Sequence, residues 1–434
     1  KSIKTMSTPN KTFAFMRGNI LVLSISGALG MFCRSMVFPY APLFIISLGG
    51  NPAEIGIVYA LGPLGGLIVY PIAGYLADHV SRAKLIAFTG YFSSLTFLIY
   101  IFAPSWHWLA AARLLQGFAV LQHPASSALI ADSLTPKSRG RGIATMMTVS
   151  GALAILAPYA AGHMLDWQGI DTGMRILYAI MAAAYAFGAT INLLFIEDIV
   201  EAKTETVEFS QLFESLKDAY SGIPALLQQF PRTLKALTAI IILGFMANGV
   251  AGPFWVVYAN THIGLTSTQW GLVLLVEAAL GNAVRIPAGF LADRYGRTRF
   301  ILAALFLSTA TLPCFIFAQT LMQVIALRCV VAITMAFFGP ACGALLADTI
   351  PRDIRGRVMA AIGRGSVRIG AATGGTGGPG VGFFTIIPLA LASVAGGLFY
   401  EWNEASPWGF LLAATGLSFA LAMFFVRDSK DAEV

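Results

Sequence analysis

The sequence predicts an all-α membrane protein whose twelve transmembrane helices form two pseudo-symmetric six-helix bundles. Three observations lead to this prediction: an apolar composition, twelve long apolar stretches, and motifs that occur twice. Of the 434 residues, 57% are hydrophobic and 11% are charged, and the mean hydropathy is +0.75. Because an ordinary soluble domain is about 25% charged, this composition excludes a soluble enzyme and, despite the net charge of +7, a nucleic-acid-binding protein.

A helix needs about 20 apolar residues to cross the hydrocarbon layer. The runs that meet this requirement are continuously apolar rather than alternating, which favours helices over a transmembrane barrel. They cover residues 19–46, 53–76, 84–103, 107–131, 142–165, 174–196, 235–259, 268–291, 300–318, 322–346, 381–400 and 407–426.

The distribution of Lys and Arg predicts the orientation of these spans. Cytoplasmic loops of membrane proteins carry an excess of both residues. If the N-terminus is inside, 23 of the 28 Lys and Arg residues lie in inner segments. The other five are Arg175 at a membrane edge, and Arg34, Arg113, Arg285 and Arg328 within spans. We therefore expect both termini in the cytoplasm and the protein in the plasma membrane.

Four motifs recur at nearly the same interval. Tyr-Leu-Ala-Asp at 75–78 returns as Phe-Leu-Ala-Asp at 290–293, and Arg113 returns as Arg328. Ala-Leu-Ile-Ala-Asp at 128–132 returns as Ala-Leu-Leu-Ala-Asp at 344–348, and the Arg-Gly-Arg at 139–141 returns at 355–357. Parallel repeats of this kind are typical of transporters that bind substrate near the membrane midplane, between the halves.

The repeat divides the chain into two bundles, residues 1–196 and 235–434. The segment 197–234 is mostly polar but has apolar residues at helical spacing, so we expect a cytoplasmic linker with an amphipathic helix. The second half has an insertion at 363–382 that is rich in glycine. We expect this insertion to be a flexible cytoplasmic lead into the eleventh span.

Two loops of the chain resemble the signature Gly-x-x-x-Asp-Arg/Lys-x-Gly-Arg/Lys-Arg/Lys of the major facilitator superfamily. The N-terminal copy keeps Gly74, Asp78 and Arg82 but has His79 and Ser81 at two positions of the signature. The C-terminal copy matches nearly throughout, at Gly289, Asp293, Arg294, Gly296 and Arg297. The fourth span resembles the family signature Arg-x-x-Gln-Gly, at Arg113, Gln116 and Gly117.

This resemblance implies alternating access by two rocking bundles, with Asp78 and Asp293 as gate residues rather than substrate ligands. Glycine in the loop motif would let two helices approach closely, and a carboxylate beside cations would latch them. A simpler alternative is that the loop cations follow only from the positive-inside rule. The fifth span matches the exporter signature of the family poorly, so the resemblance leaves uptake open.

Charges within spans need a physical reason, because one at the bilayer centre costs about 2.5–3.5 kcal/mol on insertion scales. Glu277, near the middle of the eighth span, is the only acidic residue deep in any span. It is a candidate for proton or cation coupling, with a structural ion pair as an equal alternative. Arg34, at the centre of the first span, is either a fixed cation for an anionic substrate or the counter-charge of Glu277.

Other intramembrane polar residues have more than one interpretation. By resemblance Arg113 takes part in proton coupling, and hydrogen bonding to backbone is the alternative for both Arg113 and Arg328. Arg285 is expected to be structural, bracing the loop motif. His123, Gln116 and Asn282 are candidates for the lining of a substrate cavity.

We therefore expect a secondary active transporter of a small organic solute, coupled to protons or another ion, with efflux slightly favoured. An uptake carrier or facilitator for organic anions that uses Arg34 is the first alternative, and a non-transporting membrane receptor or sensor on the same fold is the second. No span carries a metal-ligand cluster or a nucleophile–base pair, so we expect no enzymatic activity, metal or cofactor. The partners are a small-molecule substrate, the coupling ion and the lipid bilayer, with no nucleic acid, and the protein is expected to be monomeric.

Overall fold

The computed structural model describes residues 17–135, 139–198, 230–350, 358, 361–362, 369–370 and 382–428. Within them the regular structure is entirely helical. The N-terminal half consists of α1 (Asn19–Val37), η2 (Phe38–Tyr40), α2 (Ala41–Ser47), α3 (Pro52–His79), α4 (Arg82–Ile101), α5 (Trp106–Gln116), η3 (Gly117–Leu121), α6 (Gln122–Ser133), α7 (Arg139–Ala154), α8 (Ala157–Gln168) and α9 (Ile170–Phe195).

The C-terminal half has the same order of spans with fewer breaks. Its elements are α12 (Arg232–Ala251), α13 (Phe254–Thr261), α14 (Ser267–Tyr295), α15 (Arg297–Thr311), η4 (Leu312–Phe317), α16 (Leu321–Thr349), α18 (Phe383–Trp402) and α19 (Ser406–Phe425).

Each of the twelve predicted spans corresponds to one helix or to a run of consecutive helices, which confirms the predicted fold class. In the described part of the chain, ten of these are long and apolar enough to cross a membrane. The other two are α3 and the broken run α5–η3–α6. The amphipathic helix predicted within 197–234 falls largely on residues 199–229, which lie outside the described residues.

Reciprocal caps set the start of repeat-related helices. The Asn51 side chain accepts a hydrogen bond from the Glu54 backbone N–H (2.9 Å), and the Glu54 carboxylate accepts one from the Asn51 N–H (2.7 Å). Thr266 and Gln269, each 215 positions later, form the same arrangement at the start of α14. Such a capping box satisfies N–H groups that a helix leaves free, so the second and eighth spans begin at equivalent points.

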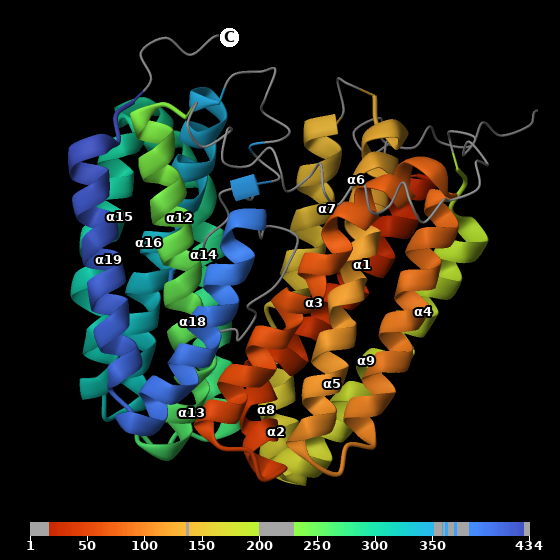
Figure 1. Cartoon of the computed structure of the whole chain (residues 1–434), viewed down its shortest axis with the longest axis horizontal. Helices are drawn as coiled ribbons and strands as arrows, with labels where there is room; N and C mark the ends of the chain where they lie inside the picture. The colour runs from red at the N-terminus through yellow and green to blue at the C-terminus, as the bar shows by residue number, and fades with distance from the viewer. Residues whose placement is uncertain are drawn as a thin grey trace, which may run out of the picture.

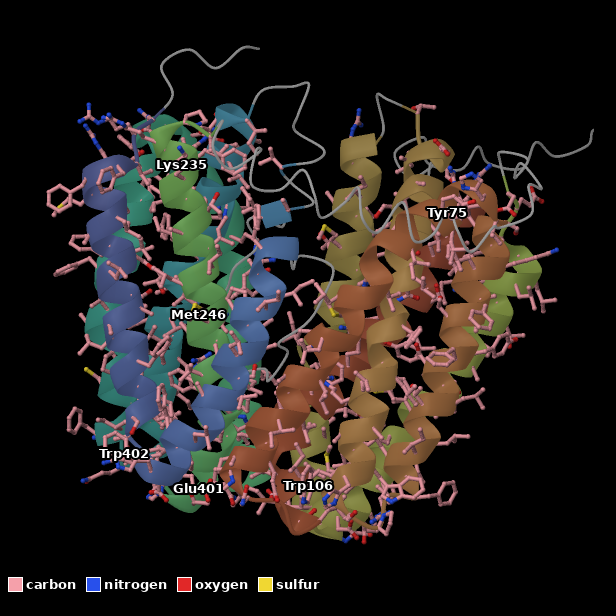
Figure 2. The ribbon with its side chains drawn as sticks, viewed as in Figure 1. Tyr75, Trp106, Lys235, Met246, Glu401 and Trp402 are labelled. Carbon is pink, nitrogen blue, oxygen red and sulfur yellow. The ribbon has the colours of Figure 1, made fainter. Side chains whose placement is uncertain are left out.

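The two halves lie side by side and meet at one end (Figure 1). We call this end, near α2, α8 and α13, the packed end, and the opposite end, which carries Arg82, Lys84, Arg297 and Arg299, the basic end. Figure 2 labels Trp106, Glu401 and Trp402 at the packed end, and Tyr75 and Lys235 at the basic end.

Close backbone contacts between α8 and α14 hold the packed end together. The buried Tyr40 hydroxyl lies 2.7 Å from the Pro158 carbonyl oxygen and 3.0 Å from that of Ser267, in the other half. A Cβ atom on Gly162 would lie 2.2 Å from the Ser267 oxygen, and one on Gly271 would lie 2.5 Å from the Pro158 oxygen. Small residues are therefore required where these helices cross.

At the basic end, described ion pairs join helices within each half. Arg82 Nη1 lies 2.6 Å from Asp132 Oδ2, and the repeat-related Arg297 pairs with Asp348 in the same way. These pairs connect the start of the third or ninth span to the end of the fourth or tenth. The cations of the loop motif thus have a structural role inside each bundle.

A second repeat-related contact caps the same two helices. The Asp198 carboxylate, just after the sixth span, accepts a hydrogen bond from the Ala83 backbone N–H (3.1 Å). The Asp428 carboxylate, just after the twelfth span, accepts one from the Thr298 N–H (3.0 Å). Because a carboxylate is favourable at a helix N-terminus, each bundle fixes its last span against its third.

Two residues of the glycine-rich insertion differ from the expectation of a flexible cytoplasmic lead. Ile369 and Gly370 are buried in the C-terminal half. The Gly370 backbone N–H donates to the Asn248 side-chain oxygen (3.0 Å), and its carbonyl oxygen accepts a hydrogen bond from Arg328 (2.7 Å). The rest of 363–381 lies outside the described residues. The physical reason for the difference is that the intramembrane Arg328 takes a backbone carbonyl of the insertion as one of its acceptors.

Candidate functional site

The main candidate site is a pocket in the N-terminal half, with about 830 Å³ of empty space that is partly open to solvent. Its wall includes four residues that the sequence predicted as candidates for substrate binding or proton coupling: Arg34 from α1, Arg113 and Gln116 from α5, and His123 from α6. Ile386 of α18 contributes from the other half. The structure therefore brings these four predicted residues together, although it does not test their roles.

Two arginines share one aromatic ring in this pocket. The Arg34 guanidinium carbon lies 5.3 Å from the centroid of Phe38, and that of Arg113 lies 5.4 Å from the same centroid. Arg113 also lies 5.4 Å from the ring centroid of Tyr59, and Tyr185 lines the same pocket as Arg34. Cation–π contacts of this kind attract a guanidinium without neutralising its charge.

Arg113 keeps hydrogen-bonding capacity that no described protein group uses. Its Nη1 donates to the Gln116 side-chain oxygen at 3.3 Å. Its Nε, and Nε2 of Gln116, are buried without a hydrogen-bond partner in the described part of the chain. A Cβ atom on Gly62 would lie 3.1 Å from Arg113 Nε, so this glycine gives the arginine its space. Buried donors usually have partners, so these two N–H groups mark an incomplete hydrogen-bond network beside the pocket.

Glu277 lies in the C-terminal half and pairs with Arg328, not with Arg34. Arg328 Nε and Nη2 donate to the Glu277 carboxylate at 2.7–2.9 Å. The Arg328 side chain is only 1% exposed, and that of Glu277 is 21% exposed. The interpretation of Arg34 as counter-charge of Glu277 is therefore wrong for this structure, because Arg328 already fills both oxygens of the carboxylate.

The remaining predicted residues lie away from the pocket or outside the described side chains. Asn282 and Arg285 lie on exposed positions of α14 and do not line the pocket. Gly74 and Asp78 are within α3, but their side-chain surroundings lie outside the described residues. The gating role of Asp78 thus stays a prediction.

In the C-terminal loop motif, Asp293 pairs with Arg297 one turn later (3.2 Å), and Arg294 stacks on Tyr295. Gly296, with φ 98°, ends α14. A Cβ atom on Gly289 would meet nothing within 4 Å. Among the described residues, no helix approaches Gly289 closely, so the expected close packing of this glycine is not seen there.

Sequence reasoning missed several residues that shape the site. Phe38 and Tyr185 carried no motif, Gly370 was expected only as part of a flexible insertion, and Asp166, near the end of α8, was given no function. The repeat offered one signal: Arg113 and Arg328 recur, but Glu277 is matched by Gly62, so only one of the two arginines has a carboxylate at the repeat-related position. This difference points to unlike environments in the two halves.

A fold of apolar helices in two halves, with a pocket that holds two arginines among mostly apolar side chains, is typical of a membrane transporter. The family model of the Major Facilitator Superfamily matches residues 23–231 and 237–434. The chain belongs to this family.

Curated relatives are similar over most of the chain. The multi-drug resistance efflux pump PmrA homolog of Lactococcus lactis is 25% identical over 335 residues, covering 75% of this chain and 79% of the relative. The multidrug resistance protein MdtG of Escherichia fergusonii is 26% identical over 406 residues, covering 89% and 94%.

Solved structures share the fold at lower identity. A bacterial homolog of the human lysosomal transporter Spinster, in an inward-facing and unoccupied conformation, has a TM-score of 0.68 at 16% identity, covering 98% of this chain and 100% of that one. The D-xylose-proton symporter has a TM-score of 0.67 at 14% identity, covering 95% and 98%. These likenesses show the fold alone.

Proposed function

We propose that this protein exports small organic solutes by proton antiport and binds them in the pocket that Arg34 and Arg113 line. The observation that carries the proposal is the pocket itself, which lies beside α18 of the opposite half and contains the four predicted lining residues. The names of the relatives support export, since both are described as multidrug resistance proteins or efflux pumps.

The arrangement of the halves supports alternating access. The halves are in contact at the packed end through Tyr40, Gly162 and Gly271. With the termini in the cytoplasm, as the Lys and Arg distribution predicts, the packed end faces outward. The structure then corresponds to a state that loads substrate from the cytoplasm, which suits an exporter acting as a monomer in the plasma membrane.

Glu277 is the proposed proton site. Its side chain is partly exposed, whereas that of its partner Arg328 is buried. Solvent can therefore deliver a proton to the Glu277 carboxylate while Arg328 stays buried. Protonation of Glu277 removes the charge that holds Arg328, which then changes its hydrogen bond to the Gly370 carbonyl oxygen. The N–H of Gly370 is in turn bonded to the Asn248 side chain, so the change reaches a second helix of the C-terminal half. A proton can thereby bias one conformation over the other.

The test is transport in proteoliposomes with an imposed proton gradient. We expect a gradient that is acidic on the side of the packed end to drive flux of at least one of ethidium, norfloxacin and naphthalene-2-sulfonate. Glu277→Gln should abolish the stimulation by the gradient but retain solute exchange at zero gradient. The matched control Glu401→Gln, at an exposed position of the packed end, should behave as wild type.

Gradient-driven flux that persists in Glu277→Gln would contradict the proton role of this residue. Flux of none of the three solutes, with correctly oriented and folded protein, would instead favour the receptor alternative.

A further inference from the structure

We infer that the pocket selects organic anions with an aromatic body, and that Arg34 and Arg113 bind the anionic group beside Phe38. This inference names a substrate class for the proposed transport function and rests on that function only for its physiological meaning. Binding itself can be measured without transport.

The charge of the pocket favours an anionic ligand. Arg34 and Arg113 both line the pocket, and among the described lining residues none is Asp or Glu. Neither arginine has a carboxylate within salt-bridge distance in the described part of the chain, whereas Arg82, Arg175, Arg297 and Arg328 all do. Two guanidinium groups that line one pocket without a carboxylate partner repel a cation and stabilise an anion.

Arg113 and Arg328 occupy repeat-related positions but have different partners. Arg328, at the position that corresponds to Arg113, has all its described hydrogen bonds directed to Glu277 and to the Gly370 carbonyl oxygen. Arg113 has Gly62 where Arg328 has Glu277, and its Nε has no partner. The carboxylate that satisfies one arginine is therefore absent from the other, so the charge of Arg113 is left for a ligand carboxylate or sulfonate to balance.

Aromatic side chains surround the two arginines of the pocket. Phe38 lies beneath both guanidinium groups, and Phe97 and Tyr185 also line the pocket. A second, smaller pocket of about 340 Å³ adjoins at Phe38 and Arg113 and is lined by Tyr59, Tyr100 and Tyr178. Aromatic rings pack well in such surroundings, so the ligand has an anionic head at the arginines and an apolar ring system against these side chains.

The experiment compares three naphthalene probes of similar size on the purified, detergent-solubilised full chain by isothermal titration calorimetry. These are naphthalene-2-sulfonate (an anion), naphthalene-2-sulfonamide (neutral) and a naphthylmethyl-trimethylammonium salt (a cation). We expect the sulfonate to bind at least about tenfold more tightly than either other probe, as the loss of charge-assisted hydrogen bonds predicts.

Variants identify the groups responsible. Arg34→Gln and Arg113→Gln should each weaken sulfonate binding by about tenfold or more, whereas Arg299→Gln, an exposed arginine of the basic end, should leave it unchanged. Arg113→Lys keeps the charge but loses the planar fork, so it should bind with intermediate affinity. Thermal melting without probe checks that each variant is folded.

Equal affinity for the sulfonate and the sulfonamide would overturn the inference, as would unchanged binding in both folded Gln variants. Occupation of the pocket by a lipid phosphate is a further outcome against it: phosphatidylglycerol in nanodiscs would then block sulfonate binding, whereas phosphatidylcholine would not. If arginine-dependent sulfonate binding is found but no gradient drives flux, the proposed export function fails and the binding inference stands.

Discussion

Arg113 and Arg328 occupy equivalent positions in the fourth and tenth spans, yet their surroundings differ. Arg328 is nearly completely buried and lies 4.7 Å from the ring centroid of Trp255. Four hydrogen bonds hold it, three to Glu277 and one to Gly370. A buried ion pair of this quality is costly to break, since removing one partner leaves the other charge without compensation. At the residue scale, the C-terminal arginine is thus structural in this conformation, while the N-terminal one has no carboxylate partner among the described residues.

Gly370 should be sensitive to a single methyl group. Its φ of 77° lies in the left-handed region, and an added Cβ atom would lie 2.5 Å from Leu312 Cδ2. We expect Gly370→Ala to destabilise the protein by about 1–2 kcal/mol or more, since a non-glycine residue in this conformation costs about that much before any clash. The fall in melting temperature of the purified protein measures this effect.

The matched control is Gly409→Ala in α19, where an added Cβ atom would meet nothing within 4 Å. This change should leave the melting temperature the same or raise it, because alanine favours helix. Equal melting temperatures for Gly370→Ala and wild type would show that the backbone at Gly370 does not hold Arg328.

At the element scale, α14 is capped by a residue of the opposite half. The Asp166 carboxylate, at the end of α8, accepts hydrogen bonds from the backbone N–H groups of Ser267 (2.9 Å) and Thr268 (2.8 Å). A carboxylate is favourable at a helix N-terminus, where N–H groups are free and the dipole is positive. Because the contact crosses between the halves, it stabilises only the conformation in which the packed end is closed.

Asp166→Asn should therefore favour opening of the packed end. The loss of the carboxylate charge at a helix N-terminus is worth about 0.5–1 kcal/mol at an exposed site, which is roughly a twofold to fivefold change in the ratio of the two conformations. Spin labels on Lys84→Cys and Arg299→Cys, with the four native cysteines replaced, would report the distance between the halves at the basic end.

We expect the short-distance population at the basic end to rise in Asp166→Asn. The control is Asp171→Asn, whose carboxylate pairs with Arg175 inside the N-terminal half and should not shift the distribution. Identical distributions for Asp166→Asn and wild type would mean that this cap does not contribute to closure.

At the scale of the whole molecule, the two ends have different contacts. The packed end joins the halves, whereas the described ion pairs of the basic end, Arg82 with Asp132 and Arg297 with Asp348, stay within each half. Each bundle is thus tied internally by equivalent contacts and can move as a unit against the other. This is the mechanical requirement of alternating access.

The orientation of the molecule is tested by labelling in intact cells. The cysteine introduced by Pro104→Cys, in the turn between α4 and α5 at the packed end, should react with a membrane-impermeant maleimide. The cysteine introduced by Lys84→Cys, at the basic end, should react only after the cells are permeabilised. Both positions are exposed, so the difference reports the side of the membrane, and the reverse pattern would contradict the predicted orientation.

The fold could be predicted almost fully from the sequence. Apolar runs long enough to span a bilayer predicted the number and order of the spans, and motifs repeated about 215 residues apart predicted how the two halves correspond. The site was predicted only in part. Arg34, Arg113, Gln116 and His123 were expected to bind substrate or couple protons because polar groups inside a bilayer need a reason to be there. The structure places all four in the wall of one pocket. Asn282 was expected for the same reason but does not line the pocket.

What the sequence alone determined is the class of structure, because the solvent preference of each segment depends on its own residues. What only the tertiary structure decided is the partner of each intramembrane charge. Glu277 pairs with Arg328 rather than Arg34 because α14 and α16 lie side by side within one bundle, and Arg34 lies in the other. A carboxylate interacts strongly only with cations within a few ångströms, and that distance is set by packing between helices rather than by position along the chain.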